Sequence, residues 1–299
     1  MLKYIIIILI VAIVIYSLPR FMSYSTTLNT SKPSVSKMLD KGHLVSISIL
    51  PIFSKENDSY NEYFRIINYI DNISNHTNIF KRNKISIKIQ QLSLNKQLQW
   101  KYLHNIIHYA QRKNVFFWIS AITMETLDIE YEYYLKLLSL GYKNIGITLA
   151  AYNTSVSKKI DHILSLKGHV RLVKGIYKGD IRNSKTIDIM YYKNAIKLID
   201  SGYYHTIATH DFKMIRKLYS YNDTFYKYIE LAFFYNSYNY VQHMLPKMPF
   251  KTDFISFYIP HGEHYSFLKD NIILYSLDNI MYIIESKFNG FKYDLLQYI

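Results

Sequence analysis

The sequence predicts an α/β fold, a TIM-like (β/α)8 barrel, because short β-branched runs alternate with helix-length amphipathic stretches from residue 43 onward. Short connections between successive units favour a parallel sheet that closes on itself. Several strand runs are apolar almost throughout, as expected of strands buried on both faces. The predicted strands span 43–50, 85–90, 115–122, 144–150, 169–176, 204–209, 228–233 and 254–260; the predicted helices span 60–75, 96–112, 127–140, 155–165, 186–201, 211–220, 235–245 and 264–289.

A single N-terminal transmembrane helix is expected to precede the barrel. Residues 4–18 read YIIIILIVAIVIYSL, a run without a charged residue that the flanking apolar residues extend to 1–22. The alternative is a cleaved signal peptide, but the residues before Pro19 do not resemble a small-residue cleavage site. We therefore expect an uncleaved, single-pass membrane anchor, with the side of the membrane left open because the flanking positive charges nearly balance.

Residues 23–42 are rich in Ser and Thr and are expected to form a tether, with the barrel domain at 43–299. Asn-x-Ser/Thr sequons are present, but in so Asn-rich a chain they do not decide the compartment. They begin at Asn29, Asn57, Asn72, Asn75, Asn153 and Asn222.

The composition excludes some kinds of site. With Cys at 0 the chain has no disulfide, zinc-thiolate site or cysteine nucleophile. The net charge of +14 would suit anionic lipid or nucleic acid, or it reflects a Lys-rich drift of the genome that gives a generally basic surface. No long run of Lys and Arg and no nucleic-acid-binding motif is present, so we expect no nucleic-acid partner.

Three of the predicted strands end in polar residues. In a parallel barrel such residues meet at the rim formed by the carboxyl ends of the strands, where chemistry is done. The three motifs are Arg171-Leu172-Val173-Lys174-Gly175-Ile176-Tyr177, Ala208-Thr209-His210-Asp211 and Tyr258-Ile259-Pro260-His261-Gly262-Glu263.

These motifs, in this order, resemble the signature strands of the proline dehydrogenase family over about residues 43–289. The resemblance implies an FAD-dependent (β/α)8 barrel that oxidises proline to pyrroline-5-carboxylate. It further implies that Lys88 and Tyr258 lie in the active site, Tyr258 against the substrate. The residues that it places at the flavin are Arg171, Lys174, Gly175, Tyr177, Thr209 and His210.

The chain departs from the family pattern at three places. The third strand of the family carries Ile-Asp-x-Glu, whereas Ile119 is followed here by Ser120, Ala121 and Ile122. A glutamine of the fourth strand is replaced by Ala150. The family's last helix carries adjacent arginines that grip the proline carboxylate, but the final arginine of this chain is Arg216. A lysine cannot replace the planar, bidentate fork of a guanidinium.

Two histidine groups have metal-ligand spacing. His104 and His108 lie four apart on a predicted helix, without the Glu of a His-Glu-x-x-His motif. His261, Glu263 and His264 follow the last strand, where they either bind a metal or cap a helix. We expect no metal at either group.

From these departures the sequence favours a membrane-anchored barrel that has lost catalysis and FAD and serves a structural or interaction role with an unidentified protein partner. Its composition suggests a large DNA virus or another fast-evolving genome, and so a virion or host-cell membrane. The alternative is an active FAD-dependent oxidoreductase, either a proline dehydrogenase or a relative with another substrate. Between the two stands a flavin-binding protein without proline activity.

Overall fold

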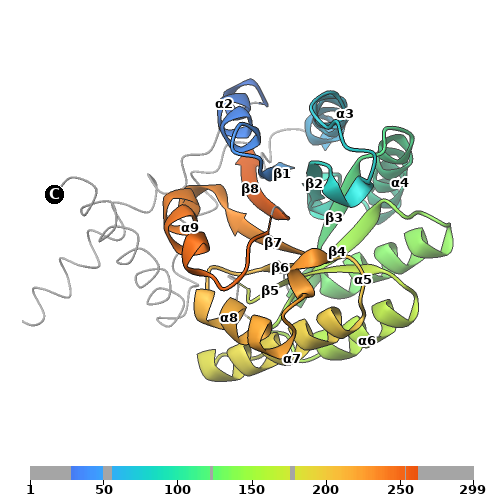
Figure 1. Ribbon diagram of the computed structural model, residues 1–299. Helices are drawn as coiled ribbons and strands as arrows, with labels where there is room; N and C mark the ends of the chain where they lie inside the picture. The colour runs from blue at the N-terminus through green and yellow to red at the C-terminus, as the bar shows by residue number, and fades with distance from the viewer. Residues whose placement is uncertain (1–27, 50–55, 122–123, 176–178, 253, 262–299) are drawn as a thin grey trace, which may run out of the picture.

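Eight parallel strands form a closed barrel in the computed structural model, in which β8 pairs with β1 (Figure 1). The structure describes residues 28–49, 56–121, 124–175, 179–252 and 254–261. The parallel α/β barrel predicted from the sequence is therefore confirmed. The strands are β1 (Leu44–Ile49), β2 (Lys84–Ile87), β3 (Phe116–Ala121), β4 (Ile145–Ala150), β5 (His169–Val173), β6 (His205–Ala208), β7 (Ile229–Phe234) and β8 (Ile255–His261).

Helices cover the outside of the barrel (Figure 1). The α-helices are α2 (Leu28–Leu39), α3 (Glu56–Asn72), α4 (Lys96–Arg112), α5 (Met124–Ser139), α6 (Val156–Ser165), α7 (Ser184–Asp200), α8 (Phe212–Tyr221) and α9 (Tyr238–Met244). Short 3-10 turns occur at η1 (Ile79–Lys81), η2 (Ile89–Gln91), η3 (Phe225–Lys227), η4 (Tyr235–Ser237) and η5 (Leu245–Lys247). The predicted helix at 264–289 lies outside the described residues.

Local sequence fixes the starts of several helices. Asn95 accepts hydrogen bonds from the backbone N–H groups of residues 97 and 98, which caps α4. Asn183 caps α7 and Asp211 caps α8 in the same way. A side chain that accepts from these otherwise unpaired N–H groups typically stabilises a helix by about 1 kcal/mol.

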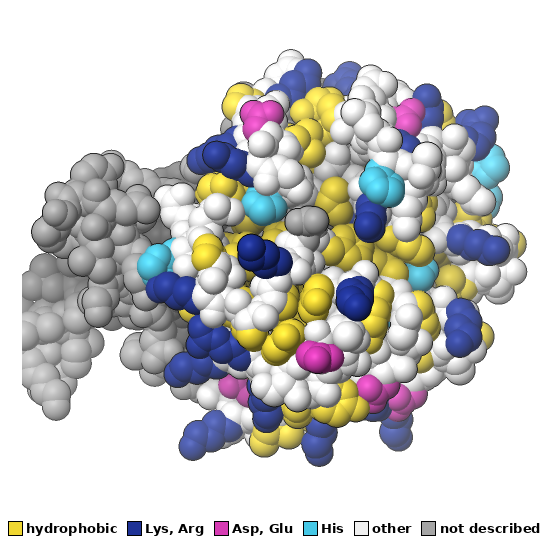
Figure 2. Space-filling view, in the orientation of Figure 1, with side chains coloured by type: hydrophobic (Ala, Val, Ile, Leu, Met, Phe, Trp, Pro, Cys, Tyr) yellow, Lys and Arg dark blue, Asp and Glu magenta, His cyan; other side chains and the backbone are white. Residues whose placement is uncertain are grey.

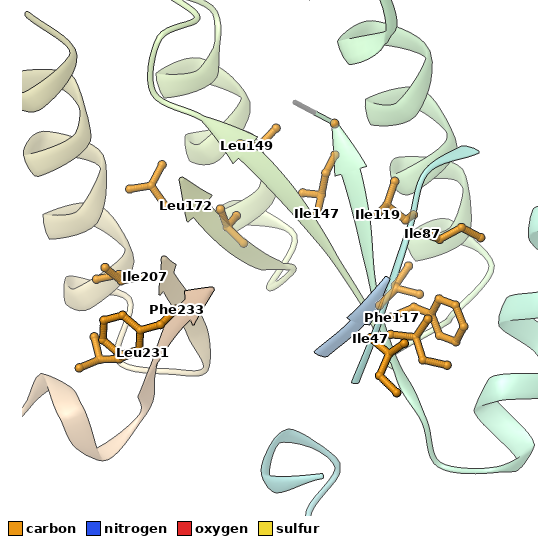
Figure 3. Packing of buried hydrophobic residues seen from close by; sticks show 14 of the residues in the cluster. Ile47, Ile87, Phe117, Ile119, Ile147, Leu149, Leu172, Ile207, Leu231 and Phe233 are labelled. Carbon is orange, nitrogen blue, oxygen red and sulfur yellow. The ribbon is translucent and has the colours of Figure 1, made fainter. Parts of the chain in front are cut away.

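Alternate strand residues point outward and pack against the helices. Figure 3 labels ten of these side chains, which are Ile, Leu or Phe on seven of the strands. Each labelled residue is at most 3% exposed. At about 25 cal/mol per Å² of apolar area, this layer between sheet and helices supplies much of the favourable energy of folding.

The other residues of each strand point into the barrel. Near the amino ends of the strands the interior is closed by aromatic rings and a buried ion pair. We call this layer the barrel floor; it comprises Lys84, Phe116, Trp118, Tyr204, Glu230 and Phe254. Toward the carboxyl ends, called here the carboxyl rim, several inward residues carry hydroxyls, among them Ser86, Ser120 and Thr148, so the two ends of the barrel differ in chemistry.

Helix α2 precedes the first strand of the barrel. Residues 28–39 were expected to belong to a tether, but they form a helix that packs against β8 and β1. Val35 and Met38 are fully buried in the core. The Ser- and Thr-rich composition concealed this apolar pair, whose spacing of three places both side chains on one helix face.

The first apolar segment, 1–22, lies outside the described residues, as do 23–27 of the expected tether. Within the part of the chain that the structure describes, no helix is long and apolar enough to cross a membrane. Figure 2 shows Lys and Arg side chains spread over much of one face, with fewer Asp and Glu among them, in keeping with the net charge of +14.

Candidate functional site

The guanidinium of Arg171 lies in the barrel interior and is the centre of the candidate site. Its Nε donates to Thr148 Oγ1 at 2.8 Å and its Nη2 donates to Ser86 Oγ at 2.6 Å. Ser86 Oγ is in turn 3.1 Å from Ser120 Oγ. Hydroxyls from β2 and β4 therefore bond to the cation, and the hydroxyl of Ser120 on β3, a position where the resemblance predicts a carboxylate, bonds to the first of them.

Arg171 is a buried cation without a described counter-ion. The residue is 6% exposed, and burial lowers its pKa to about 10 against the opposing effects of Tyr258, Glu230 and Tyr204, so it stays charged near neutral pH. Among the described residues, no carboxylate lies within ion-pair distance of it. A charge desolvated in this way favours an anionic or electron-rich ligand.

Tyr258, on β8, lies over this cation. The Arg171 Cζ is 5.8 Å from the centre of the Tyr258 ring and 5.4 Å from that of Trp118. Burial raises the pKa of Tyr258, while a hydrogen bond with Ser48 and the charge of Arg171 oppose the rise. The phenol is thus neutral at physiological pH, and side chains of the fifth and eighth strands lie close together in the barrel interior.

Lys88 lies at the carboxyl rim, immediately after β2. The predicted strand runs to residue 90, but the structure turns earlier: Lys88 is the N-cap residue of the 3-10 turn η2. Burial lowers the pKa of Lys88 to about 8, and Glu130 opposes this effect. An amine with such a pKa can take up or release a proton near neutral pH.

Glu130, from α5, is a functional candidate that the sequence analysis missed. Its side chain is fully buried, and it accepts hydrogen bonds from Gln90 Nε2 at 2.7 Å and Thr126 Oγ1 at 3.0 Å. Burial raises its pKa to about 8. One signal was present in the sequence: Glu130 interrupts the buried stripe of α5, between Leu127 and Tyr134.

Lys174 turns outward from β5, away from the interior where Arg171 lies. Its Nζ pairs with Asp188 of α7 at 2.5 Å and with Asp211, the cap of α8, at 2.9 Å. The two carboxylates raise its pKa despite its partial burial. In this arrangement Lys174 ties β5 to two helices, and its predicted contact with a flavin stays a prediction.

Thr209 and His210 follow β6 at the carboxyl rim. Thr209 Oγ1 accepts a hydrogen bond from the Asp211 backbone N–H at 3.1 Å. The Phe234 backbone N–H donates to His210 Nε2 at 3.1 Å, and the two rings stack with centres 5.5 Å apart. Burial lowers the pKa of His210 to about 4. The imidazole is therefore neutral, with its proton on Nδ1 as a donor.

Gly175 ends the fifth-strand motif in a backbone conformation that needs glycine. Its φ is +112°, and a Cβ at this position would lie 1.7 Å from the Tyr152 ring. The same ring packs against Gly179, where a Cβ would lie 2.2 Å from it. Tyr152 thus occupies the space between the two glycines, whereas the predicted flavin contact Tyr177 lies outside the described residues.

The barrel floor contains an ion pair that the sequence did not reveal. Lys84 Nζ lies 2.7 Å from Glu230 Oε2, with side chains 0% and 1% exposed. Tyr204 Oη and Ser256 Oγ donate to the same carboxylate, at 2.9 and 2.5 Å. Because these groups are satisfied by one another, they close the barrel below Arg171.

The two histidine groups of the sequence are only partly described. His104 Nε2 and His108 Nδ1 lie 3.0 and 3.3 Å from the hydroxyl of Tyr142, on the outside of the barrel. No group of three or more His, Cys, Asp or Glu side chains that could hold a metal occurs among the described residues. His261 ends β8, and Glu263 and His264 lie outside these residues.

Comparison with known proteins identifies similar sequences. A family model described as proline dehydrogenase matches residues 32–269. Proline dehydrogenase 2 of Bacillus subtilis strain 168 is 28% identical over 200 residues, which cover 62% of this chain and 63% of that protein. Proline dehydrogenase 1 of Bacillus subtilis subsp. natto is 28% identical over 146 residues, or 45% of this chain and 46% of that protein. The match thus spans less than two thirds of either relative.

Solved structures share the fold. Proline utilization A from Bdellovibrio bacteriovorus, inactivated by N-propargylglycine, superposes with a TM-score of 0.69 at 16% identity, over 80% of this chain and 30% of that one. A Bradyrhizobium japonicum proline utilization A mutant superposes with a TM-score of 0.66 at 17% identity, over 79% and 29% of the two chains. At such identities the likeness is one of fold.

Proposed function

Because the chain belongs to the proline dehydrogenase family, we propose that it is an FAD-dependent oxidoreductase that removes hydride from a small cyclic amine. The observation that carries the proposal is the buried cation Arg171, which is held by hydroxyls and has no carboxylate partner among the described residues. This places the alternative of the sequence analysis ahead of the inactive barrel, since no finding supports inactivation.

The donor set at the rim fits a flavin. Arg171 would hold the electron-rich edge of the ring, where negative charge grows as the ring is reduced. His210, which is neutral, would offer its Nδ1 proton to the cofactor from β6. When bound, FAD would supply the acceptor for the hydride and later pass its electrons to an outside oxidant.

The protein residues have separate tasks in such a reaction. Tyr258 would cover the substrate ring beside Arg171. Lys88 Nζ, with a pKa of about 8, would exchange a proton with the substrate nitrogen, because only the neutral amine has the lone pair that assists loss of hydride. Loss of one hydride and one N–H proton would turn the neutral amine into the imine; the hydride would pass to bound FAD, and Lys88 Nζ would take the proton.

We propose that the substrate lacks the carboxylate of proline. With Arg216 as the last arginine, the segment after β8 has no guanidinium to grip a carboxylate in bidentate fashion. Loss of such a buried, charge-assisted contact typically costs several kcal/mol, on the order of 3–5. Pyrrolidine, which is proline without its carboxylate, is therefore the test substrate.

The test is the visible absorption spectrum of the full chain, purified in detergent, incubated with FAD and freed of excess cofactor. The proposal predicts a yellow protein that bleaches anaerobically with pyrrolidine and more slowly with proline. A folded protein that stays colourless after incubation with FAD would contradict it.

The variant Arg171→Gln tests the observation itself. Loss of a hydrogen-bonding charge should cost about 2–3 kcal/mol of flavin binding, or roughly 30- to 150-fold in Kd. Lys213→Gln is the matched control, because Lys213 is an exposed cation of α8. Equal FAD affinity in Arg171→Gln and wild type would remove Arg171 from the cofactor site.

A scaffold function is the second candidate, favoured by the departures at the rim. Ser120 stands where the family carries a carboxylate, and its hydroxyl bonds to Ser86 instead. In this case the barrel binds neither FAD nor amine and presents its rim to a protein partner. The spectrum described above separates the two functions, since only the oxidoreductase becomes coloured.

Membrane attachment is a separate proposal, for which the apolar residues 1–22 are the support. A chain that begins at residue 23 should then be recovered in the supernatant after alkaline extraction of membranes, while the full chain stays in the pellet. Persistent attachment of the shortened chain would refute the anchor.

A further inference from the structure

Glu130 is a buried carboxylate in a position that the proposed reaction has not yet used. It lies on the face of α5 that packs on the barrel, in line with the buried residues Leu127, Tyr134 and Leu137. Its side chain is 0% exposed. A carboxylate in such a stripe loses its hydration, so it needs partners that offset the loss.

The partners of Glu130 connect it to the turn that carries Lys88. Gln90 donates to Glu130 Oε1 at 2.7 Å, and Gln90 lies two residues beyond Lys88 in η2. The next residue, Gln91, donates to the Ile49 carbonyl at 3.0 Å and accepts from Tyr63 Oη at 3.2 Å. Hydrogen bonds from α5, β1 and α3 therefore hold this turn from three sides.

The charged groups around this turn are few. Lys88 and Glu130 interact electrostatically, so that each favours the charged form of the other. Tyr63 faces Lys88 from α3 through a hydrogen bond to the Lys88 backbone, and burial keeps this phenol neutral because it raises the pKa. Thr126, the remaining partner of the Glu130 carboxylate, does not titrate.

We propose that Glu130 is the positioning residue of Lys88: through Gln90 it fixes the turn that carries Lys88, and its carboxylate favours the charged ammonium at the carboxyl rim. The third strand, β3, carries Ser120 and Ala121 near the carboxyl rim, where neither is acidic. An acidic side chain near this rim is Glu130, from the following helix α5. The pairing rests on the geometry of η2 and α5. Its value for catalysis rests on the proposed oxidoreductase function.

The test measures the proton on Lys88 without any flavin. Competitive acetylation with acetic anhydride from pH 6 to 10, followed by peptide mass spectrometry, reports the fraction of each lysine that is neutral. In Glu130→Gln, which keeps an acceptor for Gln90, Lys88 should lose its proton at lower pH and react about twofold faster near pH 8, where the Glu130 carboxyl of the wild type ionises. Exposed Lys81 is the internal reference.

Two further variants make the result specific. Glu132→Gln removes an exposed carboxylate from the same helix and should leave the Lys88 profile unchanged. Glu130→Asp withdraws the charge by one methylene and should shift the profile in the same direction by a smaller amount. If Glu130→Gln does not fold, this variant still decides the matter.

The outcomes separate the two proposals. An unchanged Lys88 profile in a folded Glu130→Gln or Glu130→Asp chain overturns the pairing, whatever the flavin spectrum shows. The expected shift in a chain that binds no FAD supports the pairing and refutes only the oxidoreductase. An equal shift in Glu132→Gln would show a general effect of helix charge and would also overturn the pairing.

Discussion

Removal of the charge of Glu230 should cost far more stability than the loss of one surface carboxylate. In the barrel floor, Lys84 Nζ bonds to Glu230 at 2.7 Å and to the carbonyls of Phe80 and Arg82 at 2.9 and 3.0 Å. The three protons of an ammonium are thus satisfied. Glu230→Gln keeps the shape of the side chain and leaves the Lys84 charge buried without its counter-ion.

The expected loss is about 3–5 kcal/mol, the usual result of breaking a buried ion pair from one side. Lys84→Met should cost a similar amount, because it strands the carboxylate instead. In the double variant neither charge remains, so its loss should be smaller than the sum of the two single losses. A coupling energy of about 2 kcal/mol or more, from urea unfolding followed by circular dichroism, would support this reasoning.

The pH dependence gives a second readout of the same charge. Burial lowers the pKa of Lys84 in the folded chain, and without Glu230 nothing of comparable strength opposes this effect. The folded variant then binds fewer protons than the unfolded chain below the ordinary lysine pKa of about 10.4. Glu230→Gln should therefore regain stability as the pH rises toward that value.

The control is the surface pair of Lys159 and Asp128, whose atoms lie 2.8 Å apart, close to the 2.7 Å of the buried pair, but whose carboxylate is 84% exposed. Asp128→Asn should cost at most about 1 kcal/mol. Two outcomes would refute the view that burial governs the energy of the pair. One is a stability loss in the double variant equal to the sum of the losses at Lys84 and Glu230. The other is a loss in Glu230→Gln no larger than that of Asp128→Asn.

Two more predictions concern single residues. Gly175→Ala should lose about 2–4 kcal/mol in urea unfolding, since it adds a clash with the Tyr152 ring to an unfavourable positive φ. Gly141→Ala shares the positive φ but meets no atom within 4 Å, so it should lose only about 1–2; equal losses would rule out the clash. His205 is fully buried, and burial lowers its pKa to about 3. Between pH 6.5 and about 3 only the unfolded chain takes up a proton at this residue. The free energy of unfolding should therefore fall as the pH drops through this range. His205→Gln should flatten this acid limb of the stability curve, whereas the exposed control His76→Gln should not; equally steep limbs in wild type and His205→Gln would exclude this residue as the cause.

The barrel could be predicted from the sequence because its strands are short apolar runs and its helices are amphipathic. The helix at 96–112 has the predicted bounds, since Asn95 caps it and Arg112 lies in its last turn. Helix α2 could not be predicted in the same way, because only two apolar side chains, Val35 and Met38, are fully buried in a Ser- and Thr-rich segment.

The candidate site could be predicted only in part, for a physical reason. Motif residues such as Arg171 and Tyr258 follow from strand ends that meet at one rim, and the structure brings the two side chains together. The partners Lys84 and Glu230 belong to β2 and β7, and only closure of the barrel makes them neighbours. No pattern in the sequence around either residue predicts such a pair. The roles of the predicted cofactor residues stay predictions.

In each strand, the residues that face outward pack against the helices, and the residues that face inward line the barrel interior. In β3, Phe117 and Ile119 face the helices and build the wall, while Trp118 and Ser120 face the interior. A codon for a lining residue can therefore change without loosening the wall. Carboxylates of the third strand can give way to hydroxyls in such a barrel while its architecture persists. Related proteins can in this way differ in substrate or in function and still share the same barrel fold.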